Sequence, residues 1–304
     1  MGSSSIATNS LKAWWLAARP KTLSGAVAPV LIGLTLAWAD GQQTAGQTFL
    51  ITPALLCLFF ALLMQIDANF INDYFDFKRG IDTETRLGPK RACAEGWITP
   101  RAMQSGIAIT TLAAALTGLP LIGYGGMELI AVGALCLVFC FLYTTTLAQR
   151  GWGDPLVVVF FGLIPVAITY YIQCHTITLP LCGVALACGM ATDALLIVNN
   201  YRDRDTDRSV NKRTLVVRIG ERPSERLYLL IGPIAVLLCL PLGLQGYPAA
   251  ALLPCLYLLP HYAAWRRMTV LKRGRELNEV LGLTARNILL FALLLSTGII
   301  LSTL

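Results

Sequence analysis

The chain has 304 residues, of which 56% are hydrophobic and 13% are charged. Soluble domains typically carry about 25% charged residues, so this composition excludes a disordered chain, a coiled coil and an ordinary soluble enzyme. The net charge is +7, from 24 Lys and Arg against 17 Asp and Glu. Such an excess suits a nucleic acid or a membrane surface, and the placement of the basic residues decides between them.

Apolar runs long enough to cross a bilayer recur along the sequence. A membrane-spanning helix needs about 20 apolar residues, and we find nine such runs. We therefore predict an all-α polytopic membrane protein, residues 1–304, with nine transmembrane helices in one bundle. The eighth run contains Pro254 and Pro260, which predict a kink or an early end. The runs cover approximately 22–39, 49–71, 102–124, 127–147, 155–174, 178–198, 227–245, 248–264 and 284–303.

The connections between these runs alternate between uncharged and basic. With nine helices, every Lys and Arg falls on the side of the N-terminus. The positive-inside rule then predicts a cytoplasmic N-terminal segment 1–21, cytoplasmic cap loops at 77–101 and 208–226, and a C-terminus on the opposite side. The basic excess is thus a topology signal, and no nucleic-acid partner is predicted.

Two clusters of Asn and Asp lie where the second and sixth runs reach the cytoplasmic side. In each cluster an Asn precedes an Asp by four residues. Residues three, four and seven apart share one face of a helix, and the matched clusters indicate a weak internal repeat. The faces predicted to carry the clusters are Asn69, Asp73 and Asp76, and Asn199, Asp203 and Asp207.

Carboxylates gathered at one membrane depth repel one another unless a cation neutralises them. An oxygen-only cluster suits Mg²⁺, which typically binds through one or two carboxylates plus substrate phosphates. A single Asp cluster at a helix end is more often a solvated loop, but two matched clusters favour a functional site. Asp73, Asp76, Asp203 and Asp207 are therefore the candidate Mg²⁺ ligands for a bound diphosphate.

Basic residues follow each cluster closely. Lys212 and Arg213, just past the second cluster, are the first candidates for direct contact with a diphosphate, and Arg86 and Lys90 follow the first cluster. Arg is suited to two-point contact with phosphate oxygens. The cysteines form no CxxC pair and lie mostly in apolar runs, so no zinc or haem site is predicted.

At these residues the chain resembles the UbiA-type membrane prenyltransferases over nearly its whole length. The resemblance includes Arg19-Pro20-Lys21-Thr22, both Asp motifs and Tyr143-Thr144. Many family members carry a third Asp seven residues after the first, whereas this chain has Gly80 there and an acid only at Asp82. The sequence patterns of residues 72–96 and 199–220 are similar to those of the 1,4-dihydroxy-2-naphthoate polyprenyltransferases.

This resemblance implies an enzyme of a bacterial cytoplasmic membrane. It implies transfer of a polyprenyl group from polyprenyl diphosphate to 1,4-dihydroxy-2-naphthoate, with loss of CO₂ and formation of demethylmenaquinone. It also implies Mg²⁺ at the four Asp residues and Lys212 as a catalytic cation. The further substrate-binding candidates are Asn69, Asn72, Asp82, Arg86, Lys90, Tyr143, Asn199, Asn200, Arg213, Arg19 and Lys21.

Two alternatives stay open. One is a family member that acts on another aromatic acceptor, such as 4-hydroxybenzoate or homogentisate. The other is an ion-coupled transporter, since membrane carboxylates and internal repeats also occur there. Transporter sites usually lie near the bilayer midplane, whereas these clusters lie at helix ends, which favours the enzyme. Asp67 and Asp193, inside the second and sixth runs, have no place in the predicted site.

Overall fold

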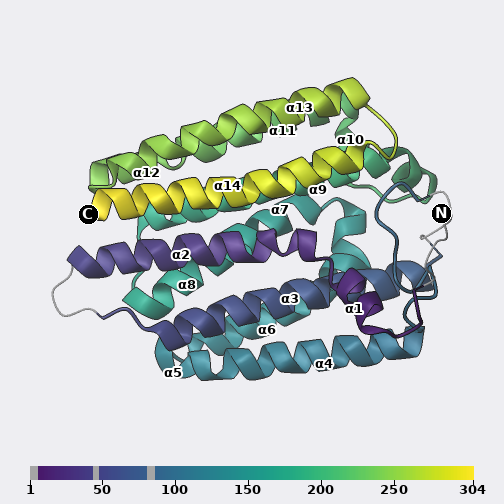
Figure 1. Ribbon diagram of the computed structural model, residues 1–304, viewed down its shortest axis with the longest axis horizontal. Coiled ribbons are helices and arrows are strands. Elements are labelled where there is room, and N and C mark those ends of the chain that lie inside the picture. The colour runs from purple at the N-terminus through teal and green to yellow at the C-terminus, as the bar shows by residue number, and fades with distance from the viewer. Residues whose placement is uncertain (1–5, 44–47, 81–85) are drawn as a thin grey trace.

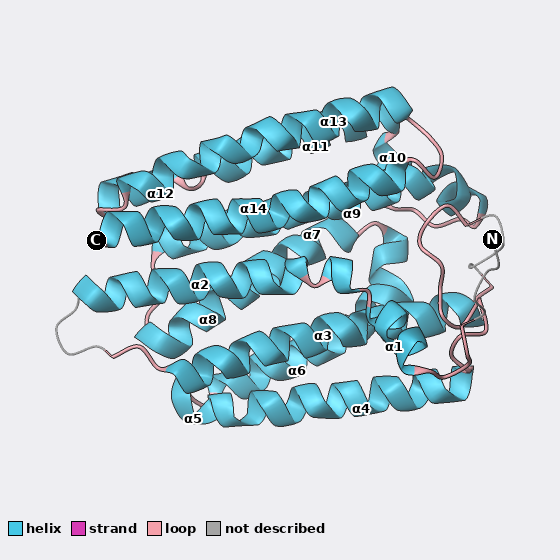
Figure 2. Ribbon diagram, in the orientation of Figure 1, coloured by secondary structure: helices cyan, strands magenta, loops and turns pink. Residues whose placement is uncertain are grey.

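The computed structural model describes residues 6–43, 48–80 and 86–304, and within these ranges the regular elements are all helical (Figure 2). The predicted all-α fold is confirmed. Short 3₁₀ and π-helical turns join several of the α-helices. The α-helices are α1 (Leu11–Ala18), α2 (Ser24–Gln43), α3 (Ile51–Lys78), α4 (Pro100–Gly118), α5 (Ile122–Gly125), α6 (Glu128–Leu142), α7 (Gly153–Val158), α8 (Ile164–Cys174), α9 (Leu179–Ser209), α10 (Leu215–Ile219), α11 (Glu221–Leu237), α12 (Pro248–Leu252), α13 (Leu258–Leu271) and α14 (Leu277–Thr303).

Eight helical stretches of the described chain are long and apolar enough to cross a membrane. The eighth predicted span, 248–264, is divided into α12, a 3₁₀ turn at Leu253–Tyr257 and α13. Pro254 cannot donate a helical hydrogen bond, which accounts for the break. The eight stretches are Ser24–Gln43, Ile51–Lys78, Pro100–Gly125, Glu128–Arg150, Gly153–Cys174, Leu179–Ser209, Glu221–Gln245 and Leu277–Thr303.

Polar caps and prolines set where several helices begin. The Thr99 hydroxyl accepts the backbone N–H of Ala102 at 3.3 Å, and Pro100 occupies the first helical position of α4. The Thr178 hydroxyl caps α9 in the same way, by accepting the backbone N–H of Leu181. An N-cap hydroxyl satisfies one of the backbone donors that a helix start leaves free, so these residues fix the register of the long helices.

Helix α9 lies at the centre of the bundle, and α6 lies at its edge. The apolar window of α9 is 67% buried, against 11% for the stretch that contains α6. Helix α14 packs against α2, α9, α12 and α13, and Figure 1 shows it running beside α2 across the bundle. The main apolar core is formed by α2, α8, α9 and α14 with part of α11 and α12.

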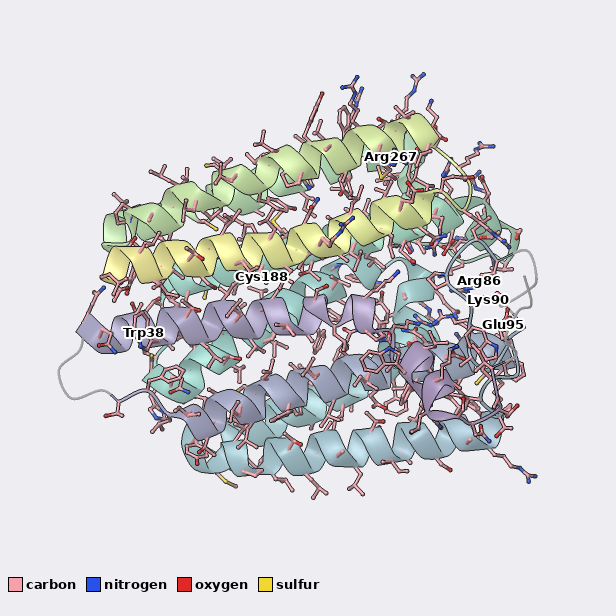
Figure 3. All side chains as sticks on the ribbon, viewed as in Figure 1. Trp38, Arg86, Lys90, Glu95, Cys188 and Arg267 are labelled. Carbon is pink, nitrogen blue, oxygen red and sulfur yellow. The ribbon has the colours of Figure 1, made fainter. Side chains whose placement is uncertain are left out.

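The two ends of the bundle differ in charge. Figure 3 shows nitrogen-bearing side chains gathered at the end where Arg86 and Lys90 lie, opposite the end marked by Trp38. The last turns of α3 and α9 reach the charged end, and α14 finishes at the other end (Figure 1). Both Asn–Asp clusters therefore reach the same end of the molecule, as their spacing in the sequence predicts.

Candidate active site

A cavity of about 830 Å³ extends from the charged end into the bundle. Its mouth is polar, and its interior is lined by apolar side chains such as Phe60, Met64, Leu137 and Ile168. A pocket of this kind, apolar with a few convergent polar groups, is typical of a binding site for a large amphipathic molecule. The predicted site residues that line it are Arg19, Asn69, Asn72, Asp76, Arg86, Tyr143, Asn199, Asn200, Asp203, Asp207 and Lys212.

The first motif presents Asn72 and Asp76 to the cavity, and Asp73 faces elsewhere. Both Asp73 carboxylate oxygens accept backbone N–H groups, from Ala92 at 2.8 Å and from Cys93 at 2.9 Å. This corrects the prediction that Asp73 shares the site face. Because α3 turns Asn72 and Asp76, four residues apart, toward the cavity, Asp73 points to the side and holds the cap segment, residues 86–99.

Asn69 holds the segment that precedes the first membrane helix. Its amide nitrogen donates to the Ala18 carbonyl at 2.9 Å and to the Thr22 hydroxyl at 3.1 Å. Between these two contacts the backbone turns at Arg19, whose φ is +51°, and Arg19 lines the cavity. The Arg-Pro-Lys-Thr sequence therefore places the Arg19 guanidinium in the site, and Asn69 holds the backbone on both sides of Arg19.

Each motif carboxylate at the mouth has a cation of the chain beside it. These ion pairs are largely buried, so their charges interact more strongly than those of exposed pairs. They offset the negative charge of the acidic clusters. The pairs are Asp76 with Arg91 at 2.9 Å, Asp203 with Arg202 at 2.6 Å, and Asp207 with Lys212 at 3.2 Å.

The side chains at the mouth fit Mg²⁺. The available donors are carbonyl and carboxylate oxygens, which are the ligands that Mg²⁺ prefers. Oδ2 of Asp207 is buried, and no donor of the described chain reaches it. Within the described residues, no three His, Cys, Asp or Glu side chains stand close enough to form a metal cage alone. The predicted cage of four Asp is therefore not preformed, and diphosphate oxygens would complete the coordination.

Tyr143 opens a π-helical turn, Tyr143–Leu147, at the cavity wall. Arg79 donates to the Thr144 carbonyl at 3.0 Å and to the Thr145 carbonyl at 2.6 Å. The Thr144 hydroxyl donates to the Asn72 side chain at 2.7 Å. Helical π turns occur frequently at functional sites, and these contacts lock Tyr143 beside the first motif.

The cap segment is fastened to two helices over the mouth. Its residues Arg86, Leu87, Pro89 and Arg91 line the cavity. The Asn278 amide on α14 donates to the Leu87 carbonyl at 2.8 Å. With Asp73 holding the other side, the segment can restrict access of water to the mouth. The second predicted cap, 208–226, contains α10 and the first turn of α11.

Some predicted residues lie away from the cavity. Lys21, Lys90 and Arg213 do not line it, and Lys90 instead pairs with Glu95 at 2.6 Å. Asp82 lies outside the described residues. Sequence reasoning missed Arg91, Arg79 and Arg202 as members of the site. Helix periodicity does not predict the contact of Arg202 with Asp203, because adjacent residues on a helix do not normally face each other.

Comparison with known proteins decides the family. The model of the UbiA prenyltransferase family matches residues 26–281. The chain belongs to this family. The resemblance seen in the motifs is thereby confirmed, and the apolar spans of this UbiA-family chain make it an integral membrane protein.

Relatives and solved structures agree with this assignment. The UbiA-family chain is 37% identical over 230 residues to 1,4-dihydroxy-2-naphthoate octaprenyltransferase of Haemophilus influenzae, which covers 72% of this chain and 73% of that protein. A UbiA homolog from Aeropyrum pernix has a TM-score of 0.65 at 17% identity, covering 90% of this chain and 98% of that one. A homolog from Archaeoglobus fulgidus bound to DMAPP and Mg²⁺ has a TM-score of 0.61 at 13% identity, covering 93% and 99%. These structures share the fold.

Proposed function

We propose that this protein transfers a polyprenyl group from polyprenyl diphosphate to 1,4-dihydroxy-2-naphthoate, with loss of CO₂, on the route to demethylmenaquinone. One observation carries the proposal: a single cavity joins a mouth ringed by both Asn–Asp motifs to a long apolar interior. That shape suits a molecule with a charged head and an apolar tail. The naphthoate acceptor is supported by the name of the relative that is 37% identical.

The mouth binds the diphosphate in this proposal. Asp76, Asp203 and Asp207, with Asn72 and Asn199, would hold Mg²⁺ against it. The bound Mg²⁺ would stabilise the negative charge on the departing diphosphate. Lys212 and Arg86 supply direct cationic contacts from the two sides of the mouth. The Archaeoglobus fulgidus homolog bound to DMAPP and Mg²⁺ supports the metal requirement.

The remaining residues protect and direct the reactive carbon. Ionisation of the allylic C–O bond places positive charge near the aromatic ring of Tyr143, which is suited to cation–π stabilisation. The cap segment limits access of water, which would otherwise capture the cation. Arg19, which lines the same cavity, provides a positive charge for the naphthoate carboxylate. With the basic end in the cytoplasm, both substrates reach the site from that side of the membrane.

An assay of the purified protein with a panel of acceptors tests the proposal. Polyprenyl diphosphate and Mg²⁺ are supplied with 1,4-dihydroxy-2-naphthoate, 4-hydroxybenzoate or homogentisate, and the prenylated products are quantified. We expect turnover with the naphthoate and none after chelation of Mg²⁺. Conversion of the benzenoid acceptors alone would show that the acceptor is wrong, and full activity in the presence of chelator would show that the metal assignment is wrong.

A further inference from the structure

Two buried carboxyl groups lie beside the cavity, deeper than the motifs. Asp154, in the first turn of α7, lines the cavity and is 5% exposed. Asp193, on α9, is 4% exposed. It precedes Asp203 by ten residues, which places it about 15 Å further from the mouth along the helix axis. Helix α7 packs against α9, and the two carboxyls are close enough to repel each other.

These carboxyls lack the hydrogen-bond donors that buried oxygens normally have. No donor on another described residue reaches either oxygen of Asp154 or Oδ1 of Asp193. An unpaired buried acceptor is unfavourable because it has lost its hydrogen bonds to water. Two buried carboxyls that lie close together are most stable when they hold one proton between them. The pair can then both take a proton and give one back.

The surroundings bring Tyr143 close to this pair. Tyr143, Asp154 and Thr192 line the same cavity. The Tyr143 hydroxyl lies 3.7 Å from the position that a Cβ atom would take at Gly153, the residue before Asp154. A ring hydroxyl of an aromatic acceptor bound beside Tyr143 would supply the donor that Asp154 lacks.

We propose that Asp154 is the catalytic base for the acceptor, with Asp193 as its positioning partner. This inference rests on the proposed function. The ring hydroxyl ortho to the carboxylate gives its proton to the ionised Asp154. The ring carbon that bears the carboxylate forms the C–C bond to the prenyl carbon. The allylic C–O bond breaks, and its electron pair leaves on the diphosphate.

The same pair completes the reaction. The first step produces a β-keto acid, because the attacked carbon carries the carboxylate and its neighbour has become a ketone. The bond to CO₂ then breaks, its electron pair restores the aromatic ring, and the ring oxygen takes the proton back from Asp154. CO₂ leaves, the Asp pair returns to its starting protonation state, and no oxidant or reductant is consumed.

Replacement of the two carboxyls tests the proposal against a matched control. Asp67 is also fully buried in a membrane helix, with one oxygen that accepts from Thr111 at 2.7 Å and one that no described donor reaches. It does not line the cavity. We expect Asp154→Asn to lower kcat about 100-fold or more, with the KM for polyprenyl diphosphate within about threefold of its original value. Asp67→Asn should keep nearly full kcat.

A series of acceptors separates a base from a structural residue. Ring-halogenated 1,4-dihydroxy-2-naphthoates of increasing hydroxyl acidity depend progressively less on a base. The ratio of wild-type to Asp154→Asn kcat should therefore shrink along the series. A constant ratio, or an unchanged kcat in Asp154→Asn, would overturn the inference. If Asp154→Asn does not fold, as judged by its melting profile, the same series is run on Asp193→Asn with the same two outcomes. A wild-type protein inactive with every naphthoate would overturn the proposed function, and this inference with it.

Discussion

Arg202 holds the carboxylate of Asp203, its neighbour in the chain, through two contacts of 2.7 and 2.6 Å. The same guanidinium donates to Asn199 and to Asn278, both at 2.8 Å. Asn278 in turn holds the cap at the Leu87 carbonyl. One buried cation thus joins the second motif, helix α14 and the cap segment.

Arg202→Gln should destabilise the protein strongly. Removing one partner of a buried ion pair typically costs about 3–5 kcal/mol, because the other charge stays buried alone. Arg267→Gln is the matched control, since the side chains of Arg267 and Glu279 are 51% and 60% exposed and such pairs contribute about 0–1 kcal/mol. Thermal unfolding of the detergent-solubilised proteins measures both. Equal shifts in Tm would show that the Arg202 network is not structural.

Asp76→Asn and Asp73→Asn should fail in different ways. Asp76 lines the mouth, so its loss should lower kcat at least about 100-fold and raise the Mg²⁺ concentration needed for half activity. Asp73 holds two backbone N–H groups of the cap, and hydrogen bonds to a charged group contribute about 1.5–3 kcal/mol each. Asp73→Asn should therefore lower Tm and leave the Mg²⁺ requirement unchanged. A matching change of the Mg²⁺ requirement in both variants would place Asp73 at the metal after all.

Arg79→Ala should impair catalysis although Arg79 does not line the main cavity. Its guanidinium holds two carbonyls of the turn that positions Tyr143. A displacement of about 1 Å in a reacting group can reduce turnover about 100-fold, so kcat should fall about 10- to 100-fold. Arg101→Ala removes the same charge from an exposed position on α4. Steady-state kinetics of the two variants are then compared. If the loss of positive charge were the cause, kcat would fall equally in Arg79→Ala and Arg101→Ala; if the displacement of Tyr143 is the cause, kcat falls only in Arg79→Ala.

Gly162→Ala should destabilise the bundle at the crossing of α9 with the π-helical turn Val159–Leu163. A Cβ atom there would lie 2.5 Å from the Ala185 carbonyl oxygen. Overpacking of this kind costs about 1–3 kcal/mol. Gly282→Ala on α14 is the control, because nothing lies within 4 Å of its Cβ position. Unfolding temperatures should fall for Gly162→Ala only, and a similar fall in both would contradict the close contact.

Ala61→Trp should shorten the prenyl chain that the protein accepts. Ala61 lines the cavity fifteen residues before Asp76 on α3, about 22 Å from the mouth at the helical rise. A large side chain there should cost about 1–3 kcal/mol for a long tail, which lowers turnover of the long-chain diphosphate about 5- to 150-fold. A short allylic diphosphate should react normally. Phe59→Trp is the control, at a 53% exposed position outside the cavity, and should leave turnover of both long and short diphosphates unchanged. The products formed from diphosphates of several chain lengths are quantified for each variant.

The sequence predicts the membrane helices well because long apolar runs leave the chain few alternatives. Pro254 indicates irregularity even in the eighth run, 248–264, although the 3₁₀ turn found there depends on local packing. The meeting of the two motifs at one end follows from counting helices. Those features depend on composition and on the order of segments, which a sequence displays directly.

The rotation of α3 could not be predicted in the same way. Asn69, Asp73 and Asp76 fit one helical face, and Asn72 with Asp76 fit another, so spacing alone permits both. The docking of Ala92 and Cys93 against Asp73 selects the second face. Arg202 and Arg79 were missed for a related reason, since their partners come from segments far along the chain, such as Asn278 and Thr144.

The three ion pairs at the cavity mouth have a consequence for product release. Under the proposed function, Asp76, Asp203 and Asp207 would have to give up Arg91, Arg202 and Lys212 in order to hold the metal with its diphosphate. Those cations would return to their carboxylates when the diphosphate departs. The protein thus competes with its own product in every cycle, and this competition limits how long the diphosphate stays bound.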